Sequence, residues 1–408
     1  MSADDIEYSL AELVLVELSK KNFELTASNQ ERLGILFNDF IACVHSGKRK
    51  YKSGASRLPP DLTQNAVRLG LYSSADDLDD VDWSVLTHPG AIIWSTALSS
   101  GLAMGLPIKA VFRAAAFGYR TGSTMAKLFG ISHRSKWHVT ATSGVFASVS
   151  TLAVLFGLTP EQHLAAFKLC AMNIGGLPQA TFEREGATQF NRSAAISLGI
   201  SSVHAALVGA PHVMDIWSTP KGLAGNFQVP PEMLIVSNRK IAQDFLVDGI
   251  STVGLRLFPC TGFAHAAALA IYELRKQLPN EVTSITVDLA KALAPLLDGS
   301  KGGDWWDPRA AIAAIAYSND LMDISSPEHL IAKTQLVFSD IRVGGGRVSL
   351  DSDGDVLEIT HLTPPGLDFS SQNEMNWRAE KWRGMIGNDY EEVLWRAQNM
   401  VGIEKLLD

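Results

Sequence analysis

Three of the ten histidines stand where a helix is expected to begin. His88 precedes Pro89-Gly90 and a long apolar stretch, His138 opens a Ser/Thr-rich apolar stretch, and His265 follows Phe258-Pro259. A helix N-terminus carries unpaired amides and partial positive charge, which favours a bound carboxylate and keeps a nearby imidazole neutral. These positions are typical of a base acting on a small anionic acid. For each histidine taken singly, a cap or a packed core residue is the alternative.

An acidic run, Asp76-Asp77-Leu78-Asp79-Asp80-Val81-Asp82, lies just before His88. If one aspartate turns inward, a carboxylate and an imidazole share one loop and form a general acid/base pair. Otherwise the run is a solvated loop, which is the commoner outcome for a cluster of like charges.

Other familiar motifs fail on inspection. Gly344-Gly345-Gly346 lies between strands with no helix after it, so a hairpin is expected rather than a phosphate-binding loop. The run 351–355 starts like a calcium loop, but Leu362 stands where a bidentate Glu is required, so a turn is expected. No cluster has metal-ligand spacing, and His133 and His138 are the only pair to consider. We therefore expect no metal.

Charge and cysteine content narrow the class of protein. Lys+Arg 35 against Asp+Glu 43 gives a net charge of −8, so nucleic acid is an unsuitable partner. Three widely spaced cysteines indicate reduced thiols, and the acidic N-terminus does not resemble a signal peptide, so we expect a cytoplasmic protein. Six Ser/Thr residues interrupt the apolar stretch 139–157, which favours a buried helix over a membrane span.

Two kinds of pattern follow one another along the 408 residues. Up to about residue 246 the apolar residues recur at helical spacing, and Thr159-Pro160-Glu161-Gln162 has the sequence of a capping box. The candidate helices are 6–22, 28–46, 60–69, 89–104, 107–128, 139–157, 160–174, 192–209 and 239–246.

Beyond Phe258-Pro259 strands and helices are mixed. Helices are expected at 263–277, 308–320, 374–384 and 389–405, and strands at 282–290, 336–344, 347–352 and 356–362. The strands are joined by Gly-Gly-Gly and Asp-Gly turns that fit hairpins. The sequence predicts a mainly α protein: a large all-helical domain, 1–255, completed by 372–408, and a smaller α+β cap domain, 256–371.

These segments resemble the MmgE/PrpD family, whose members include 2-methylcitrate dehydratase, cis-aconitate decarboxylase and iminodisuccinate epimerase. The likeness covers nearly the whole chain. Its specific part is Asp77-Leu78-Asp79-Asp80, then His88-Pro89-Gly90-Ala91, then Gly118-Tyr119; Trp137-His138, 156–162, Gly222-Leu223 and Phe258-Pro259-Cys260 with His265 also match.

The resemblance implies a helical domain with a smaller cap, an active site in the cleft between them, a homodimer, and no metal or organic cofactor. The family's catalytic set corresponds to Asp77, His88 and His138, and the cap-domain side of the site to 260–265, where His265 is the expected helper. Substrate contacts are expected from Asp80, His133, Trp137, Gln189, Arg192, Cys260 and Thr261. Such enzymes move a proton next to a carboxylate and stabilise the resulting carbanion.

One departure affects the substrate. The family Lys is replaced by Ala187 or Thr188, Phe190 stands at a family His, and Arg192 replaces a Gly. A family Thr is also absent, with Val81 or Asp82 in its place. Two functions remain. The first is a cofactor-free lyase or isomerase acting by dehydration, decarboxylation, isomerisation or cyclisation in a biosynthetic pathway, on something other than the usual tricarboxylates. The second is a catalytically silent member that binds a small molecule or a partner protein.

Overall fold

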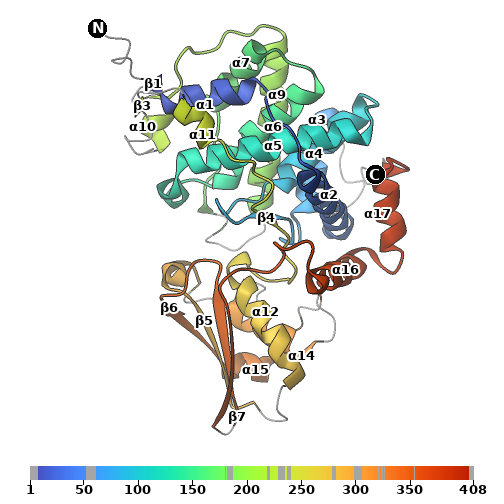
Figure 1. The fold of residues 1–408 in the computed structure, drawn as a ribbon, viewed down its shortest axis with the longest axis vertical. Helices are drawn as coiled ribbons and strands as arrows, with labels where there is room; N and C mark the ends of the chain where they lie inside the picture. The colour runs from blue at the N-terminus through green and yellow to red at the C-terminus, as the bar shows by residue number, and fades with distance from the viewer. Residues whose placement is uncertain are drawn as a thin grey trace. The chain divides into compact units, whose positions relative to one another are not determined.

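The computed structural model divides into two compact units (Figure 1). The first unit comprises 1–75, 82–253 and 394–408, and the second comprises 76–81 and 254–393. We describe each unit by itself. The residues described are 8–51, 61–179, 181, 187–217, 221–227, 235–236, 240–277, 282–297, 306–318, 322, 325, 327–352 and 354–403.

The first unit is built from helices at the positions that the apolar periodicity predicts. They are α1 (Leu10–Ser19), α2 (Ala27–Gly47), α3 (Leu62–Ser73), α4 (Gly90–Ala103), α5 (Ile108–Phe129), α6 (Val139–Leu155), α7 (Pro160–Ala171), α9 (Thr188–Leu207), α10 (Leu223–Phe227) and α11 (Lys240–Phe245). Strands β1 (Tyr8–Ser9) and β3 (Ile235–Val236) pair with each other. Strands β2 (Val81–Asp82) and β4 (Val253–Gly254) each lie at a boundary between the two units in the sequence. The ends of three expected helices, at 6–7, 60 and 239, lie outside the described residues.

Several of these helices begin at a side-chain cap. Ser9, Thr26 and Asp61 each accept a backbone N–H from the first turn that follows. Thr159 and Gln162 form the predicted capping box at the start of α7. Each such cap satisfies an amide that the helix itself leaves unpaired, a contribution of about 1 kcal/mol.

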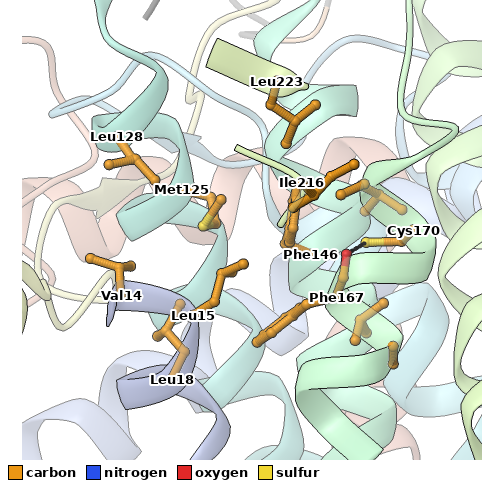
Figure 2. Close-up of a cluster of buried hydrophobic side chains, with 14 of the residues drawn as sticks. Val14, Leu15, Leu18, Met125, Leu128, Phe146, Phe167, Cys170, Ile216 and Leu223 are labelled. Atoms are coloured by element: carbon orange, nitrogen blue, oxygen red, sulfur yellow. Dashed lines mark hydrogen bonds between the residues drawn. The ribbon is translucent and has the colours of Figure 1, made fainter. Parts of the chain in front are cut away.

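Helix α6 is the centre of the first unit and contacts α4, α5, α7 and α9. Its Phe146, which is 0% exposed, lies among the aliphatic and aromatic side chains of α1, α5 and α7 (Figure 2). The backbones approach closely where glycine removes the side chain. A Cβ at Gly144 would lie 2.2 Å from Ile92 Cδ1, and one at Gly118 would lie 2.4 Å from Thr151 Oγ1. Both glycines are therefore needed for packing.

The hydroxyl groups of α6 are satisfied inside the bundle. Ser148 Oγ lies 3.1 Å from Thr96 Oγ1 of α4, and Ser150 Oγ accepts a hydrogen bond from Thr121 of α5 at 2.7 Å. These contacts explain how a Ser/Thr-rich apolar segment is stable in a protein core. Among the residues that the structure describes, no helix is both long and apolar enough to span a membrane.

The second unit contains a four-stranded sheet with the order β6-β5-β7-β8. The strands are β5 (Ser284–Ala290), β6 (Thr334–Ser339), β7 (Gly346–Ser352) and β8 (Asp355–His361). β5 pairs in parallel with β6 (Ile285 with Thr334) and antiparallel with β7 (Ile285 with Leu350). β7 and β8 pair antiparallel, with Leu350 opposite Leu357.

This order corrects one expectation. Residues 344–346 do not form a hairpin, because β5 lies between β6 and β7 and each pairs with β5 instead. The close approach of Gly346 to α12 (His265–Leu274) explains the glycine, since a Cβ there would lie 2.7 Å from Ala267 N. The expected turn between β7 and β8 is a hairpin connection, although residue 353 lies outside the described residues.

Helices accompany the sheet in the second unit. α12 contacts β7, β8 and α14 (Pro308–Tyr317), and α14 also contacts β6. Asp307 caps α14 by accepting the N–H of Arg309 at 2.9 Å. The remaining helices are α13 (Ala294–Leu297), α15 (Glu328–Lys333), α16 (Gln372–Ile386) and α17 (Tyr390–Gln398). A mainly helical protein with a small α+β part is thus confirmed.

The observed units divide at 253/254, against the expected 255/256, and differ more at two other segments. Residues 76–81 and 372–393 belong to the second unit, and only 394–408 return to the first. The physical reason is a set of hydrogen bonds. Lys381 of α16 donates to the carbonyl oxygen of Leu78 at 2.8 Å, and Arg256 donates to that of Asp79 at 2.9 Å.

Truncating Phe146 tests the packing of the first unit. Phe146→Ala removes a fully buried ring at the centre of α6, so it should lower the free energy of unfolding by about 3 to 5 kcal/mol. Met172→Ala, at a side chain that is 53% exposed, should change it by less than about 0.5 kcal/mol. Urea unfolding followed by circular dichroism measures both. Equal losses in the two variants would contradict this packing.

Candidate active site

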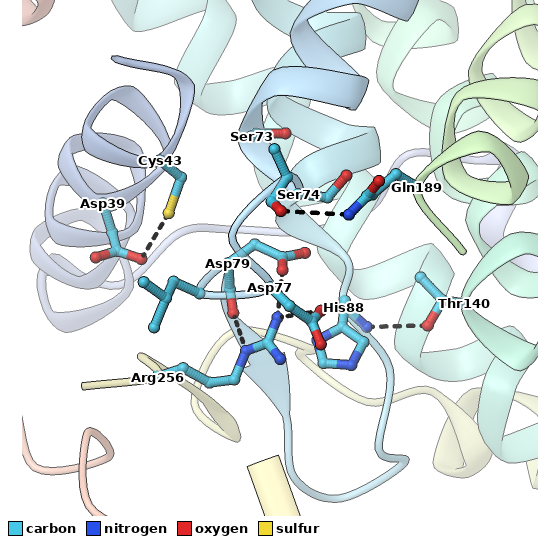
Figure 3. Close-up of polar contacts among 12 residues, drawn as sticks. Asp39, Cys43, Ser73, Ser74, Asp77, Asp79, His88, Thr140, Gln189 and Arg256 are labelled. Carbon is cyan, nitrogen blue, oxygen red and sulfur yellow. Dashed lines mark hydrogen bonds and ion pairs between the residues drawn. The ribbon is translucent and has the colours of Figure 1, made fainter. Parts of the chain in front are cut away.

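The first unit brings together the helix starts that carry His88 and His138. His138 is the N-cap residue of α6, and His88 lies two residues before α4. The backbone N–H of His88 donates to Thr140 Oγ1, in the first turn of α6, at 3.2 Å (Figure 3). Both histidines are half-buried as residues, and the Nδ1 of His138 has almost no exposed surface. The predicted placement of two histidines at helix N-termini is therefore observed.

Arg134 holds the chain segment before His88. Its guanidinium donates to the carbonyl oxygens of Val85 and Leu86, the latter at 2.5 Å. Leu86 has φ +51°, a left-handed conformation that is costly for a bulky residue. Burial lowers the pKa of Arg134 to about 10, so this cation stays charged at neutral pH. The turn leading to His88 is thus fixed by a charge-assisted contact.

A loop after α7 covers the start of α6. The N–H of His138 donates to the carbonyl oxygen of Gly176 at 2.8 Å, and Asn191 of α9 donates to that of Leu177 at 3.0 Å. Gly176 has φ +123°, and a Cβ there would lie 3.0 Å from the Cβ of Ala141. The start of α9 is therefore tied through this loop to His138.

The side chain of Gln189, a predicted substrate contact, joins three segments of the first unit by hydrogen bonds. Its Oε1 accepts a hydrogen bond from Tyr51 at 3.2 Å, and its Nε2 donates to the carbonyl oxygen of Ala75 at 3.4 Å. Ala75 is the last residue of the first unit before the acidic run. Gln189 is half-buried, and its observed partners position the chain that leads into that run.

His133 lies in a buried aromatic cluster. It is 1% exposed, stacks on Phe129 with the ring centroids 4.8 Å apart, and contacts Phe227 at 4.4 Å. Its Nε2 lies 2.8 Å from Thr142 Oγ1. Burial, with a smaller effect of Arg134, lowers the pKa of His133 to about 4. His133 is therefore a neutral residue packed in the core. This is the alternative given above for a single histidine, and it differs from the predicted substrate contact.

Trp137 and Arg192 are placed differently from His88. The ring of Trp137 is half-buried and lies 5.1 Å from that of Phe227, at the edge of the same aromatic cluster. Arg192 of α9 is only 2% exposed. An arginine so deeply buried has little solvent-facing surface with which to replace the missing family Lys.

In the second unit the acidic run folds around Arg256. The Nη2 of Arg256 donates to Asp77 Oδ1 at 2.8 Å and to Asp79 Oδ1, and its Nε donates to the carbonyl oxygen of Asp79 (Figure 3). The side chain of Arg256 is 1% exposed. Burial alone would lower the pKa of Arg256, but the two carboxylates outweigh that effect and raise it. The guanidinium is a permanent buried cation.

Asp77 is the most open of these carboxylates, with a side chain that is 15% exposed. Its φ of +53° is left-handed, a conformation that aspartate tolerates better than most residues. Asp79 and Asp80 are buried at 3% and 4% exposure, and Lys381, which is fully buried, donates to the carbonyl oxygen of Leu78, the residue between Asp77 and Asp79. The alternative of a solvated loop is therefore wrong for these residues.

Asp82, the last carboxylate of the run, is a structural residue of the first unit. It is fully buried and accepts hydrogen bonds from Ser84, from Ser123 and, at 2.8 Å, from Thr252. Asp82 therefore organises the turn before His88 through these hydrogen bonds.

His265, Cys260 and Thr261 lie buried in the second unit, with 0%, 1% and 0% exposure. The Nε2 of His265 lies 3.1 Å from the carbonyl oxygen of Phe258. Burial lowers the pKa of His265 to about 3, and the cations Arg256 and Lys381 lower it further. Burial also raises the pKa of the Cys260 thiol. These groups hold the turn at 258–262 and are not exposed enough to exchange protons with solvent.

No three His, Cys, Asp or Glu side chains gather into a possible metal site in the part of the chain that the structure describes. Cys43, Cys170 and Cys260 are buried and form no disulfide.

Comparison with known protein families identifies the part of the chain that resembles one of them. Residues 41–231 match the sequence profile of the MmgE/PrpD N-terminal domain. The chain belongs to the MmgE/PrpD family. A comparison with curated proteins found no match.

Within this MmgE/PrpD chain, two buried cations were missed by sequence reasoning. Arg256 interrupts the apolar run 253–258, and a lone charge in such a run signals a buried partner. Lys381 has no comparable signal, because α16 is rich in charged residues throughout. Arg192 lies close in sequence to the position of the missing family Lys, but it is buried. The cation that binds the acidic run is Arg256 instead.

Removing Arg256 tests how the acidic run is held. Arg256→Met should lower the free energy of unfolding by about 3 to 5 kcal/mol, because it leaves Asp79 buried without its cation. Hydrogen exchange of the amides at 76–81 should accelerate in that variant. Lys20→Met removes an ion pair to Glu17 whose lysine is 42% exposed, and should cost at most about 1 kcal/mol. Unchanged exchange at 76–81 would refute the role of Arg256.

The buried histidines predict a pH dependence of stability. Because the pKa of His265 is about 3 in the folded chain and that of an unfolded histidine is 6.5, the unfolded state binds the proton first as pH falls. The free energy of unfolding should therefore fall below pH 6.5, by up to about 1.4 kcal/mol per pH unit for this residue. His265→Gln should show a shallower fall in urea unfolding from pH 7 to 5. The exposed His212→Gln should match the wild type, and equal slopes in all three proteins would contradict the assignment.

Proposed function

We propose that this protein is a cofactor-independent lyase or isomerase that removes a proton from a carbon next to a carboxylate or carbonyl. Membership of the MmgE/PrpD family suggests an enzyme of the dehydratase or lyase type. The observation that carries the proposal is the hydrogen bond from His88 N–H to Thr140 Oγ1. It joins two helix N-termini, each bearing a half-buried imidazole, within the family domain.

The two histidines suit the two halves of a proton transfer. One imidazole accepts the proton from carbon, and the other donates to the oxygen on which negative charge develops. The first-turn amides of α4 and α6 supply partial positive charge that favours a substrate carboxylate. No metal or redox step is needed for this chemistry. The carbanion expels hydroxide in a dehydration, takes the proton back at another carbon or on the other face in an isomerisation, and attacks an electrophilic carbon of the same substrate in a cyclisation. In a decarboxylation the carbanion forms by loss of CO₂, and a histidine supplies the proton that replaces it.

The residues of the second unit have supporting roles in the proposal. Asp77 keeps its proposed catalytic assignment, since it is the more exposed of the two carboxylates that Arg256 binds. His265, fully buried against Phe258, is assigned to positioning the turn at 258–262 rather than to acid/base chemistry. Asp80, Cys260 and Thr261 are also buried, and we assign them structural roles within the second unit.

The charge distribution favours a substrate with fewer carboxylates than those of the family's tricarboxylate enzymes. The family Lys is absent at Ala187 or Thr188, Arg192 is buried, and Arg256 is already bound by two aspartates. Each missing charge-assisted contact weakens binding of a carboxylate by roughly 1.5 to 3 kcal/mol. A homodimer, a cytoplasmic location and a place in biosynthesis are parts of the same proposal.

Deuterium exchange tests the chemistry before the net reaction is known. The protein is incubated in D₂O, with a chelator present, with small mono-, di- and tricarboxylates and with keto acids, and loss of the α-proton signal is followed by NMR. We expect exchange in at least one compound. His88→Gln and His138→Gln should each slow it on the order of 100-fold, as for loss of a general acid or base. Circular dichroism checks that both variants fold.

His204→Gln is the matched control, because His204 is exposed on α9 and lies in the same family domain. It should exchange at the wild-type rate. If no compound exchanges, the catalytically silent alternative is the better account of the missing Lys. If exchange persists in both the His88 and His138 variants, proton abstraction by these residues is wrong.

A further inference from the structure

The first unit has a cavity of about 330 Å³ that uses none of the residues assigned above. It lies between the chain after α1, the first half of α5 and the end of α6. Its walls include Lys21, Leu106, Arg113, Phe117, Val154 and Leu155. Cavities of roughly 300 Å³ and above are the size at which proteins bind small molecules.

Two cations share this cavity without an acidic partner. The ammonium group of Lys21 donates to the carbonyl oxygen of Leu158 at 2.5 Å, and neither Lys21 nor Arg113 forms an ion pair with any residue in the described part of the chain. The pKa of Lys21 is lowered by burial and by the charge of Arg113. Two cations close together at one cavity create a local positive potential that favours an anion, although the chain as a whole has a net charge of −8.

The conformation of Lys21 supports a fixed role. Lys21 has φ +55°, a left-handed conformation that costs a non-glycine residue of order 1 kcal/mol. It lies two residues after the end of α1 and is held in place by the bond to Leu158, in the segment between α6 and α7. This backbone turn directs the lysine stem to the cavity wall, where it is half-buried.

The rest of the wall is apolar and rigid. Arg113 and Phe117 are four residues apart on α5 and so share one face of the helix. Phe117 is 3% exposed and meets the edge of Phe23 with the ring centroids 5.8 Å apart. The guanidinium of Arg120 lies 4.6 Å from the centroid of Phe23 on its other side. The cavity lining therefore combines two cations with aromatic and aliphatic side chains.

We propose that this cavity binds a small molecule with one anionic head, a carboxylate or a phosphate ester, and a compact apolar or aromatic body. The head lies between Lys21 and Arg113, and the body contacts Phe117, Leu106 and Val154. The site is separate from the residues of the proposed reaction, so binding here does not depend on that proposal.

Calorimetric titration of the full chain with three probes tests the site. Phenylacetate and phenylphosphate carry both parts of the ligand, with different heads, and inorganic phosphate carries the head alone. We expect at least one aromatic anion to bind more tightly than inorganic phosphate, and its affinity to fall with added salt. The better of the two aromatic anions identifies the head group.

Variants locate the binding. Arg113→Met and Lys21→Met each remove one charge-assisted contact and should weaken the better aromatic probe about tenfold or more. Lys109→Met is the matched control, because Lys109 is exposed one turn earlier on α5, carries the same charge and does not line the cavity. It should bind as the wild type does. Arg113 is exposed, so its variant should fold even if Lys21→Met does not.

Three results would overturn the proposal. The first is the absence of binding of both aromatic anions at millimolar concentration. The second is wild-type affinity in a folded Arg113→Met variant. The third is binding of inorganic phosphate as tightly as phenylphosphate, which would show an ion contact without a site for the apolar body.

Discussion

The burial of Arg256 against the acidic run is the interaction on which the second unit's site residues depend. A guanidinium taken out of water is stable only if carboxylates and carbonyls replace its hydration, and Asp77, Asp79 and the Asp79 carbonyl do so. The same contacts hold Asp77 in a left-handed backbone conformation. One buried cation therefore fixes the position and the backbone conformation of Asp77, the more exposed of its two carboxylate partners.

In the first unit an equivalent constraint comes from close helix packing. α4, α5 and α6 approach closely because Gly118 and Gly144 have no side chains, and the hydroxyls of Thr96 and Thr121 satisfy serines of α6. A bundle packed to this density leaves little freedom in where α4 and α6 begin. The packing of α4 against α6 thus sets the hydrogen bond from the His88 amide to Thr140. The proposed catalytic geometry therefore depends on core residues of these helices as well as on the two histidines.

A feature of the fold or site could be predicted where its signal comes from residues close together in the sequence. Helix positions and the capping box at Thr159 come from neighbours in sequence, so apolar periodicity located nearly all of them. Strand order depends on residues far apart in the sequence. The sequence at Gly344–Gly346 therefore does not indicate that β5 lies between β6 and β7. Helix-start positions located His88 and His138, but the sequence could not show that Arg192 would be buried or that Arg256 would bind the acidic run.

Burial separates the histidines more clearly than their sequence context does. His88, His138 and His265 have similar surroundings in sequence, since each precedes or opens a helix. Only His265 is fully buried, beside two cations that oppose its protonation, and a histidine with a pKa near 3 cannot carry a proton at neutral pH. His88 and His138 are only half-buried, and this difference in burial, rather than in residue type, supports their proposed roles in proton transfer.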